Sequence, residues 1–292
     1  MDIEAHRPET LGDGEIPLDT VVNMDCIEGM AALPAGSVDV IVTSPPYNIG
    51  KEYATYNDSR PRREFLTWIG AVMAECRRVL RDDGSMFLNV GGKPSDPWIP
   101  LDIAMEAREH FHMQNVIHWV KSIAIPADSV GKSCGVENDL AVGHYKPVNS
   151  ERYLSSCQEY VFHLTRKGAT PLDKLAVGVE YQDKSNIRRW KSGEGGLRDR
   201  GNVWFIPYET IQTSRPHPTM YPERLPEMCI RLHGKDRVRV VLDPFMGTGS
   251  TAVACVKQGV RFIGFEIDPE YVTIAYERVQ EAMDTIGKGS KA

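Results

Sequence analysis

Two hydrophobic patterns alternate along the chain, namely short β-branched runs and longer stretches with helical spacing. Residues 38–42 read Val-Asp-Val-Ile-Val, which is typical of a strand buried in a parallel sheet. Apolar residues then recur at helical spacing through residues 63–81. This alternation predicts an α/β fold. Further strands are expected at residues 20–24, 85–90, 115–120, 159–164, 203–207, 237–242 and 261–266, and further helices at 26–33, 101–112, 225–232 and 252–258.

The predicted helix at residues 63–81 carries aromatic residues on its apolar face. Phe65 and Trp68 share that face with aliphatic residues, so we expect both rings to pack in the core and not at a ligand site. The tripeptide Asp82-Asp83-Gly84 follows the periodic stretch. Because glycine commonly follows the last turn of a helix, we expect the helix to end there.

A rigid polar turn, Ser44-Pro45-Pro46-Tyr47, follows the first buried strand. The two prolines fix φ and bias Ser44 away from the helical region. The Ser44 hydroxyl and the Pro45 carbonyl are therefore acceptors at the carboxyl edge of the sheet, where open α/β folds bind ligands. With Tyr47 as a stacking surface, the turn suits a planar group that carries an amine, such as a nucleobase. A proline-rich turn with Tyr47 in the core accounts for these residues equally well.

A second motif lies near the end of the chain and joins a strand, a glycine turn and a helix. The strand at 237–242 leads into Asp243-Pro244-Phe245-Met246-Gly247-Thr248-Gly249-Ser250-Thr251. Gly247 and Gly249 let the backbone approach a ligand closely, and the helix that follows offers unpaired amide donors at its N-terminus. Glu266 ends the next strand, 19 positions after Gly247, where dinucleotide folds place the carboxylate that binds a ribose.

The second motif also restricts the ligand. No Lys-Ser/Thr pair follows the glycines, and a third glycine at the dinucleotide spacing is missing. A ligand with a ribose but no pyrophosphate, such as S-adenosylmethionine, therefore fits better than NAD or ATP. Asp25, after the strand at 20–24, is a further candidate to bind an adenine amine or a ribose, and it is an equally good helix N-cap.

The clearest basic cluster lies in a loop-rich region before the second motif. Between residues 184 and 200, six basic residues face two acidic ones in a chain whose formal net charge is -6. Trp190 lies among them, and basic side chains interleaved with an aromatic ring suit contacts to phosphates and bases. A solvated basic loop is the alternative. The candidate DNA-binding residues are Lys184, Arg188, Arg189, Lys191, Arg198 and Arg200.

Composition narrows the class of protein further. The 292 residues are 41% hydrophobic and 25% charged, which is ordinary for a globular protein with a sizeable core. Six cysteines are scattered without paired spacing, which indicates reduced thiols and predicts neither a disulfide framework nor a metal site. The chain shows no signal peptide or apolar run of membrane length. We therefore expect a cytoplasmic protein, at the nucleoid, with no membrane partner.

Taken together, Thr43-Ser44-Pro45-Pro46-Tyr47 and the segment 243–249 resemble the two signature motifs of DNA amino-methyltransferases. Their order, with the catalytic motif first, resembles the β group of that family. Trp119-Val120-Lys121 and His217-Pro218-Thr219 add to the resemblance, which covers about residues 20–279.

The resemblance implies a Rossmann-like methyltransferase fold, with a mostly parallel sheet of seven strands, one of them antiparallel, and a loop-rich target-recognition insert. It also implies S-adenosylmethionine as methyl donor and a target base flipped out of duplex DNA. The residues that the family motifs place in catalysis are Ser44, Pro45, Pro46 and Tyr47. Those placed at the cofactor are Asp25, Thr43, His217, Pro218, Thr219, Asp243, Pro244, Phe245, Gly247, Gly249, Ser250 and Glu266.

Serine at the first position of the turn is most often found in cytosine-N4 methylases of this family, so Ser44 favours cytosine over adenine. The alternatives are an adenine-N6 DNA methylase, an RNA or protein-glutamine methylase, and a DNA-binding regulator without catalysis. A homodimer and a cognate restriction endonuclease are left open as partners.

The sequence also predicts how the chain is divided. The expected parts are an amino-terminal arm (1–18), a catalytic half (19–121), a target-recognition region with a core strand near 159–164 (122–210), a cofactor-binding half (211–285) and a tail (286–292).

Overall fold

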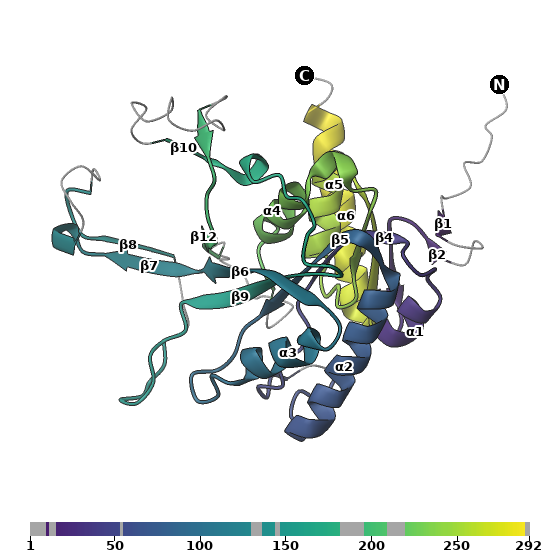
Figure 1. Cartoon of the computed structure of the whole chain (residues 1–292), viewed down its shortest axis with the longest axis horizontal. Coiled ribbons are helices and arrows are strands. Elements are labelled where there is room, and N and C mark those ends of the chain that lie inside the picture. Colours follow the sequence, from purple (N-terminus) through teal and green to yellow (C-terminus); the bar gives the residue numbers. More distant parts are fainter. Residues whose placement is uncertain are drawn as a thin grey trace.

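The computed structural model describes residues 10–11, 16–52, 55–129, 136–143, 147–181, 196–208 and 220–289. In this part of the chain, a mixed sheet of eight strands runs through the molecule in the spatial order β12-β6-β9-β5-β4-β13-β14-β3 (Figure 1). Its strands are β3 (Thr20–Asn23), β4 (Val38–Thr43), β5 (Leu80–Val90), β6 (His112–Val120), β9 (Gln158–Thr165), β12 (Val203–Phe205), β13 (Val240–Asp243) and β14 (Arg261–Glu266).

The described part of the chain also contains three short strand pairs and six α-helices. The pairs are β1 (Thr10–Leu11) with β2 (Ile16–Pro17), β7 (Ser122–Ile125) with β8 (Leu140–Gly143), and β10 (Val179–Glu180) with β11 (Leu197–Arg198). The helices are α1 (Cys26–Ala31), α2 (Arg62–Val79), α3 (Ile99–Arg108), α4 (Arg224–His233), α5 (Ser250–Gln258) and α6 (Pro269–Gly289). Short 3-10 turns lie at Ala127–Ser129, Leu175–Val177 and Lys235–Arg237. None of the described helices is both long and apolar enough to cross a membrane.

Helices cover both faces of the sheet, and each face has its own hydrophobic core. Figure 1 shows α1, α2 and α3 on one side and α4, α5 and α6 on the other. Every residue of β4 is buried, as its sequence predicts for a central strand. Because successive side chains of a strand point to opposite faces, Ile41 joins the core under α2 and α3, whereas Val40 and Val42 join the core under α4, α5 and α6.

The direction of the chain reverses between β4 and β13, which are parallel neighbours in the sheet. From β4 the chain passes through α2 to β5 on one side, and from β13 it passes through α5 to β14 on the other. The loops that leave β4 and β13 therefore diverge at the carboxyl edge. In open α/β sheets, this reversal point is where ligands bind.

The predicted strand count was wrong by one, whereas the single antiparallel strand is confirmed. That strand is β9, which pairs antiparallel with both β5 and β6. The count of seven came from the family resemblance, and the eighth strand is β12, which pairs parallel with the outer side of β6. The hydrophobic pattern did predict this strand, at residues 203–207.

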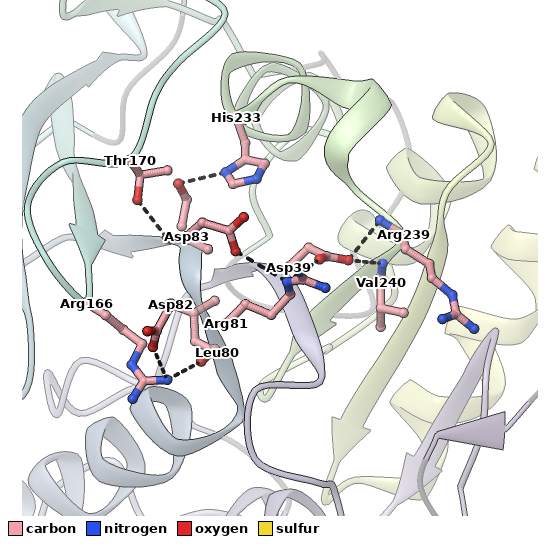
Figure 2. Close-up of polar contacts among 12 residues, drawn as sticks. Asp39, Leu80, Arg81, Asp82, Asp83, Arg166, Thr170, His233, Arg239 and Val240 are labelled. Atoms are coloured by element: carbon pink, nitrogen blue, oxygen red, sulfur yellow. Dashed lines mark hydrogen bonds and ion pairs between the residues drawn. The ribbon is translucent and has the colours of Figure 1, made fainter.

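The predicted end of the long helix at Asp82-Asp83-Gly84 was also wrong. Helix α2 ends at Val79, and Leu80 turns to extended backbone and starts β5. The tripeptide lies inside β5, where Asp82 forms an ion pair with Arg166 at 3.0 Å (Figure 2). A side chain at Gly84 would stand 2.8 Å from the Asp39 carbonyl oxygen. Gly84 is therefore needed for the close packing of neighbouring strands and not for a helix cap.

Asp39 joins β4 to β13 at the amino edge of the sheet, opposite the reversal point of the loops. Figure 2 shows its carboxylate accepting hydrogen bonds from the backbone amides of Arg239 and Val240, each at 2.9 Å. Arg81 approaches the same carboxylate at 3.3 Å. Although a charge in a buried strand is costly, these bonds satisfy it and fix the alignment of the two strands.

Candidate active site

A cavity of about 180 Å³ lies at the carboxyl ends of β4 and β13. Both sequence motifs line it: Ser44 and Tyr47 from the turn after β4, and Phe245 and Gly247 from the turn after β13. Side chains at the base of the two turns are in direct contact, because the Thr43 hydroxyl donates to Asp243 at 2.6 Å. Two segments about 200 positions apart in the sequence thus form one site.

Asp243 holds these turns together from below the cavity. Its carboxylate accepts hydrogen bonds from the hydroxyls of Thr43 and Thr251 at 2.6 Å and of Tyr221 at 2.9 Å, and from the Phe245 amide at 3.0 Å. Burial raises the pKa of Asp243, and the hydrogen bonds oppose this rise.

Three residues predicted at the cofactor do not line the cavity. Thr43 and Asp243 are buried and bind each other, so their part is to position the two turns. Gly249 has a left-handed φ of 88° where α5 begins, and a side chain there would stand 2.9 Å from the Ala275 Cβ atom. It therefore serves close helix packing rather than ligand approach.

Glu266, at the end of β14, lines the cavity beside the glycine turn. Its two oxygens accept the backbone amides of Gly247 at 2.8 Å and Asp268 at 2.9 Å. Burial raises the pKa of Glu266, and these two amides oppose the rise. Because a carboxylate has about four acceptor positions, roughly two remain for hydroxyl groups of a ligand.

Asp25 combines both functions that its sequence position suggests. One carboxylate oxygen caps α1 by accepting the amides of Ile27 at 2.8 Å and Glu28 at 3.3 Å. The residue also lines the cavity, on the same side as Glu266. The capping bonds hold the carboxylate in a fixed orientation next to a ligand site.

Aromatic side chains form one wall of the cavity. Trp68 on α2 meets Phe245 edge-on at 5.6 Å between ring centroids and lies 5.6 Å from Tyr56. The prediction that Phe65 is a core residue is confirmed, since that ring is fully buried. The same prediction was wrong for Trp68, which is only half-buried and lines the cavity. Residue 68 lies near the start of α2, where the helix passes from the core to the edge of the site.

The loop between β4 and α2 is tied into a compact form beside the cavity. Buried Asp58 accepts the amides of Asn48 at 2.7 Å, Ile49 at 3.1 Å and Lys51 at 2.9 Å. The Asn48 side chain exchanges two further hydrogen bonds with the backbone of Arg60. Lys51 and Arg60 are thereby held at the cavity as positive charges.

A polar network lies behind the Ser44 turn. The Tyr47 hydroxyl is 2.7 Å from the Ser44 hydroxyl, 2.8 Å from the Asn89 side-chain nitrogen and 3.1 Å from Glu159. Glu159 in turn pairs with Lys121 at 2.8 Å. Burial, followed by the charge of Glu159, raises the pKa of Tyr47 well above its ordinary value, so the phenol keeps its proton.

The structure brings most of the residues predicted for catalysis and for the cofactor to this cavity. Those that line it are Asp25, Ser44, Pro45, Pro46, Tyr47, Pro244, Phe245, Gly247, Ser250 and Glu266. His217, Pro218 and Thr219 lie outside the described residues, whereas Met220 and Tyr221, which follow them directly, line the cavity.

The predicted DNA-binding residues lie mostly outside the described part of the chain, namely Lys184, Arg188, Arg189 and Lys191. Of the other two, Arg198 is exposed in β11. Arg200 donates to the Val177 carbonyl at 2.8 Å. Its guanidinium therefore supports the local fold in this structure, and a role in DNA contact stays a prediction.

Sequence reasoning missed the residues behind the turn. Asn89 is a buried polar residue at the end of a predicted strand, which is a detectable signal. Glu159 lies at the start of β9, and because β9 is antiparallel, its start meets the carboxyl ends of β5 and β6. A charged residue at a strand start signals a site only when the strand direction is known.

Comparison with solved structures identifies the class of fold. PvuII DNA methyltransferase, a cytosine-N4-specific enzyme, matches with a TM-score of 0.63 at 18% identity, over 91% of this chain and 92% of that one. The DNA modification methylase TTHA0409 of Thermus thermophilus, solved in complex with S-adenosyl-L-methionine, matches with a TM-score of 0.58 at 24% identity, over 90% and 94%. The sheet and its flanking helices therefore have the Rossmann-like fold of S-adenosylmethionine-dependent methyltransferases.

Sequence comparison then gives the family. The DNA methylase family of N6 and N4 enzymes matches residues 38–277. The type II methyltransferase M.BglII of Bacillus subtilis is 32% identical over 272 residues, covering 89% of this chain and 68% of M.BglII. The DNA adenine methyltransferase YhdJ of Escherichia coli (strain K12) is 28% identical over 266 residues, covering 90% and 83%. The chain belongs to the N6/N4 DNA methylase family and is an S-adenosylmethionine-dependent DNA amino-methyltransferase.

The chemistry of the cavity walls fits this cofactor. The apolar side chains of Met24 and Ile267 line the cavity and are 39% and 47% exposed. They suit packing against the face of an adenine ring. Glu266 has acceptor positions left for ribose hydroxyls, and Asp25 lies on the same side. An apolar wall with two carboxylates is what an adenosyl group requires of its binding site.

Proposed function

We propose that this enzyme methylates the exocyclic N4 amine of cytosine in duplex DNA, after flipping the base out of the helix. The observation that carries the proposal is the shared cavity. The Ser44-Pro45 acceptors and the Gly247 turn line it from two adjacent parallel strands. Serine at position 44 supports cytosine, because the family most often combines serine there with N4 methylation. YhdJ acts on adenine, so adenine N6 is the second candidate.

The chain contributes orientation rather than a strong base. S-adenosylmethionine supplies an electrophilic methyl group on a sulfonium. The Ser44 hydroxyl and the Pro45 carbonyl accept the two N–H bonds of the target amine and hold them out of the ring plane, which frees the nitrogen lone pair for in-line attack on a methyl carbon. The S–C bond would break as the N–C bond forms, its electron pair would stay on the departing S-adenosylhomocysteine, and the amine would lose one proton to solvent after the transfer. Tyr47 stacks on the base. Catalysis then comes mainly from holding the reacting atoms in line at close range.

The free energy needed to flip the base is similar in size to the free energy gained from its contacts in the site. Removing a base from the duplex stack costs a few kcal/mol. Stacking on one aromatic ring returns about 1 to 3 kcal/mol, so Tyr47 nearly offsets the cost. Hydrogen bonds at Ser44 and Pro45 supply the remainder.

Digestion of the product identifies the base. Unmodified duplex DNA is incubated with the enzyme and methyl-labelled S-adenosylmethionine, then hydrolysed to nucleosides that are identified by mass. We expect N4-methyldeoxycytidine. A Tyr47→Ala protein gives the control, because it keeps the Glu266 side of the cavity and loses the stacking surface. N6-methyldeoxyadenosine would reassign the base within the same family. Absence of any methylated deoxynucleoside from a folded, cofactor-binding enzyme would refute the proposal.

A further inference from the structure

In the hydrogen-bond network behind the Ser44 turn, the donor and the acceptor of each bond can be assigned. The assignment starts from the ion pair between Glu159 and Lys121. Glu159 lies 2.8 Å from the Lys121 ammonium, and their side chains are only 13% and 11% exposed. A carboxylate accepts hydrogen bonds and cannot donate them. Every polar group that faces Glu159 must therefore point a proton toward it.

The Tyr47 hydroxyl is one of these groups, at 3.1 Å from the Glu159 carboxylate. Its single proton must lie between the two oxygens, since two lone pairs would otherwise face each other. The competing acceptors are both neutral, namely the Ser44 hydroxyl oxygen at 2.7 Å and the Asn89 backbone carbonyl at 3.5 Å. Bonds to ionised acceptors are the stronger ones, so Glu159 takes the Tyr47 proton.

Asn89 is oriented by the same carboxylate. Its side-chain nitrogen lies 2.8 Å from both Glu159 and the Tyr47 oxygen. The reversed amide would turn an acceptor oxygen toward the Glu159 charge. Both amide protons of Asn89 are therefore committed to Glu159 and Tyr47, and the Tyr47 oxygen accepts.

Ser44 comes last in the chain of bonds. Its hydroxyl is 2.7 Å from that of Tyr47, whose proton is already given to Glu159, so the Ser44 proton must point to Tyr47. Among the described residues its other contact is Asn89 at 3.4 Å, and the protons of Asn89 are committed elsewhere. The Ser44 oxygen thus lines the cavity with lone pairs only.

We infer that Glu159, paired with Lys121, is a positioning residue that makes Ser44 an obligate acceptor, so that the cavity selects bases carrying an amine over bases carrying a carbonyl at the same position. The inference rests on the proposed function and deepens it. Cytosine and adenine present N–H donors to Ser44, whereas uracil and hypoxanthine present an acceptor oxygen. With a carbonyl base, the Ser44 oxygen and the base oxygen would face each other without a proton between them. This should reduce the affinity for the duplex by roughly 5- to 150-fold.

The nucleoside experiment identifies the target base, and sequencing fragments of the methyl-labelled DNA then maps the methylated site. The test uses duplexes of that site that carry either the natural target base or its carbonyl counterpart (uracil for cytosine, hypoxanthine for adenine). Duplex affinity is measured in the presence of S-adenosylhomocysteine. Replacing the target base also creates a mismatch, which makes flipping easier by the same amount for every protein. This effect cancels when the ratio of the two duplex affinities is compared between the wild type and a variant. The variants are Glu159→Gln, which can donate to Tyr47, and Tyr47→Phe, which breaks the chain of bonds.

We expect Glu159→Gln and Tyr47→Phe to reduce the preference for the amino base by about 5-fold or more and to lower kcat, with cofactor affinity unchanged. Because Glu159→Gln leaves the buried Lys121 ammonium without its negatively charged partner, a Lys121→Met/Glu159→Gln double variant is measured as well. Glu75→Gln, which removes a helix ion pair with Arg78 away from the cavity, is the matched control and should behave as wild type.

A purely structural role for Glu159 would weaken binding to both duplexes equally and leave the preference unchanged, and that result would overturn the inference. Failure of the proposed function is distinguishable, because it shows in the wild-type enzyme. If the mapped target is adenine, the cytosine assignment falls, and the hypoxanthine comparison still tests Glu159.

Discussion

Gly91 lies where Tyr47 and Glu159 meet, and a residue without a side chain is required there. A Cβ atom at this position would stand 2.9 Å from the Glu159 carboxyl carbon and 3.0 Å from the Tyr47 ring. Ser44 and Tyr47 define the chemistry of the turn, but their placement depends on this contact behind them. The site therefore depends on the absence of a Cβ atom at Gly91 as well as on its polar side chains.

Replacing Gly91 by alanine should displace Tyr47 or Glu159 by several tenths of an ångström and lower kcat by roughly 10- to 100-fold. The affinity for S-adenosylmethionine should stay unchanged, because Gly91 does not line the cavity. Steady-state kinetics and calorimetric cofactor binding check this. Gly287→Ala is the matched control, since nothing lies within 4 Å of its added methyl group on the exposed face of α6. Equal kcat values for the two variants would contradict the role of Gly91.

At the scale of elements, β9 decides what the site contains. Its residues predict a strand, and the structure confirms one at Gln158–Thr165. Its antiparallel direction could not be read from the sequence, because hydrophobic pattern gives no strand polarity. That direction brings Glu159 to Tyr47, behind the Ser44 turn, and places His163 toward the opposite end of the strand. The motif residues were predictable because turn chemistry is local, whereas the network behind them depends on strand pairing.

Two histidines are buried around one serine in the core between β5, β9 and α4. Asn115 donates to His163, so the other nitrogen of that ring donates to Ser85, which in turn donates to His233 at 2.9 Å. Burial, and then the mutual charge of the rings, lowers the pKa of His163 to about 3. Burial, and then Arg237, lowers the pKa of His233 to about 4. Protonating His163 would place its new N–H proton opposite the Asn115 amide donor, and protonating His233 would break the hydrogen bond that it accepts from Ser85.

These lowered pKa values predict a loss of stability in mild acid. The unfolded chain takes up protons near pH 6.5 while the folded rings remain neutral, so the stabilisation is complete above that pH and is lost as pH falls towards 4. Between pH 6.5 and 5 the free energy of unfolding should fall by about 2 kcal/mol per ring. Urea denaturation at pH 7.5, 6 and 5 measures this.

A His163→Gln/His233→Gln double variant separates these rings from other acid-sensitive groups. It should lose markedly less unfolding free energy between pH 7.5 and 5 than the wild type, whatever its absolute stability. If both proteins lose the same amount, other groups carry the acid sensitivity.

At the scale of the whole molecule, the sheet unites two halves of the chain at its point of reversal. Strands β3 to β6 come from the predicted catalytic half, and β13 and β14 come from the predicted cofactor half. The order of the motifs and the mostly parallel sheet were predictable, because alternating strands and helices leave few topologies. The short edge strand β12 was also expected, since it lies within the strand predicted at 203–207, whereas its parallel pairing with β6 could not be read from the hydrophobic pattern.

The central claim is that one cavity brings an everted base at the Ser44 turn to the methyl donor beside the Gly247 turn. A crystal structure of the enzyme with S-adenosylhomocysteine and a duplex containing its mapped site tests this most directly. We expect the target base to stack on Tyr47, its amine to bind Ser44 and Pro45, and the cofactor sulfur to lie on the in-line path beyond the amine, close enough for direct methyl transfer. A base still stacked in the duplex, or a cofactor bound away from Phe245 and Gly247, would contradict it.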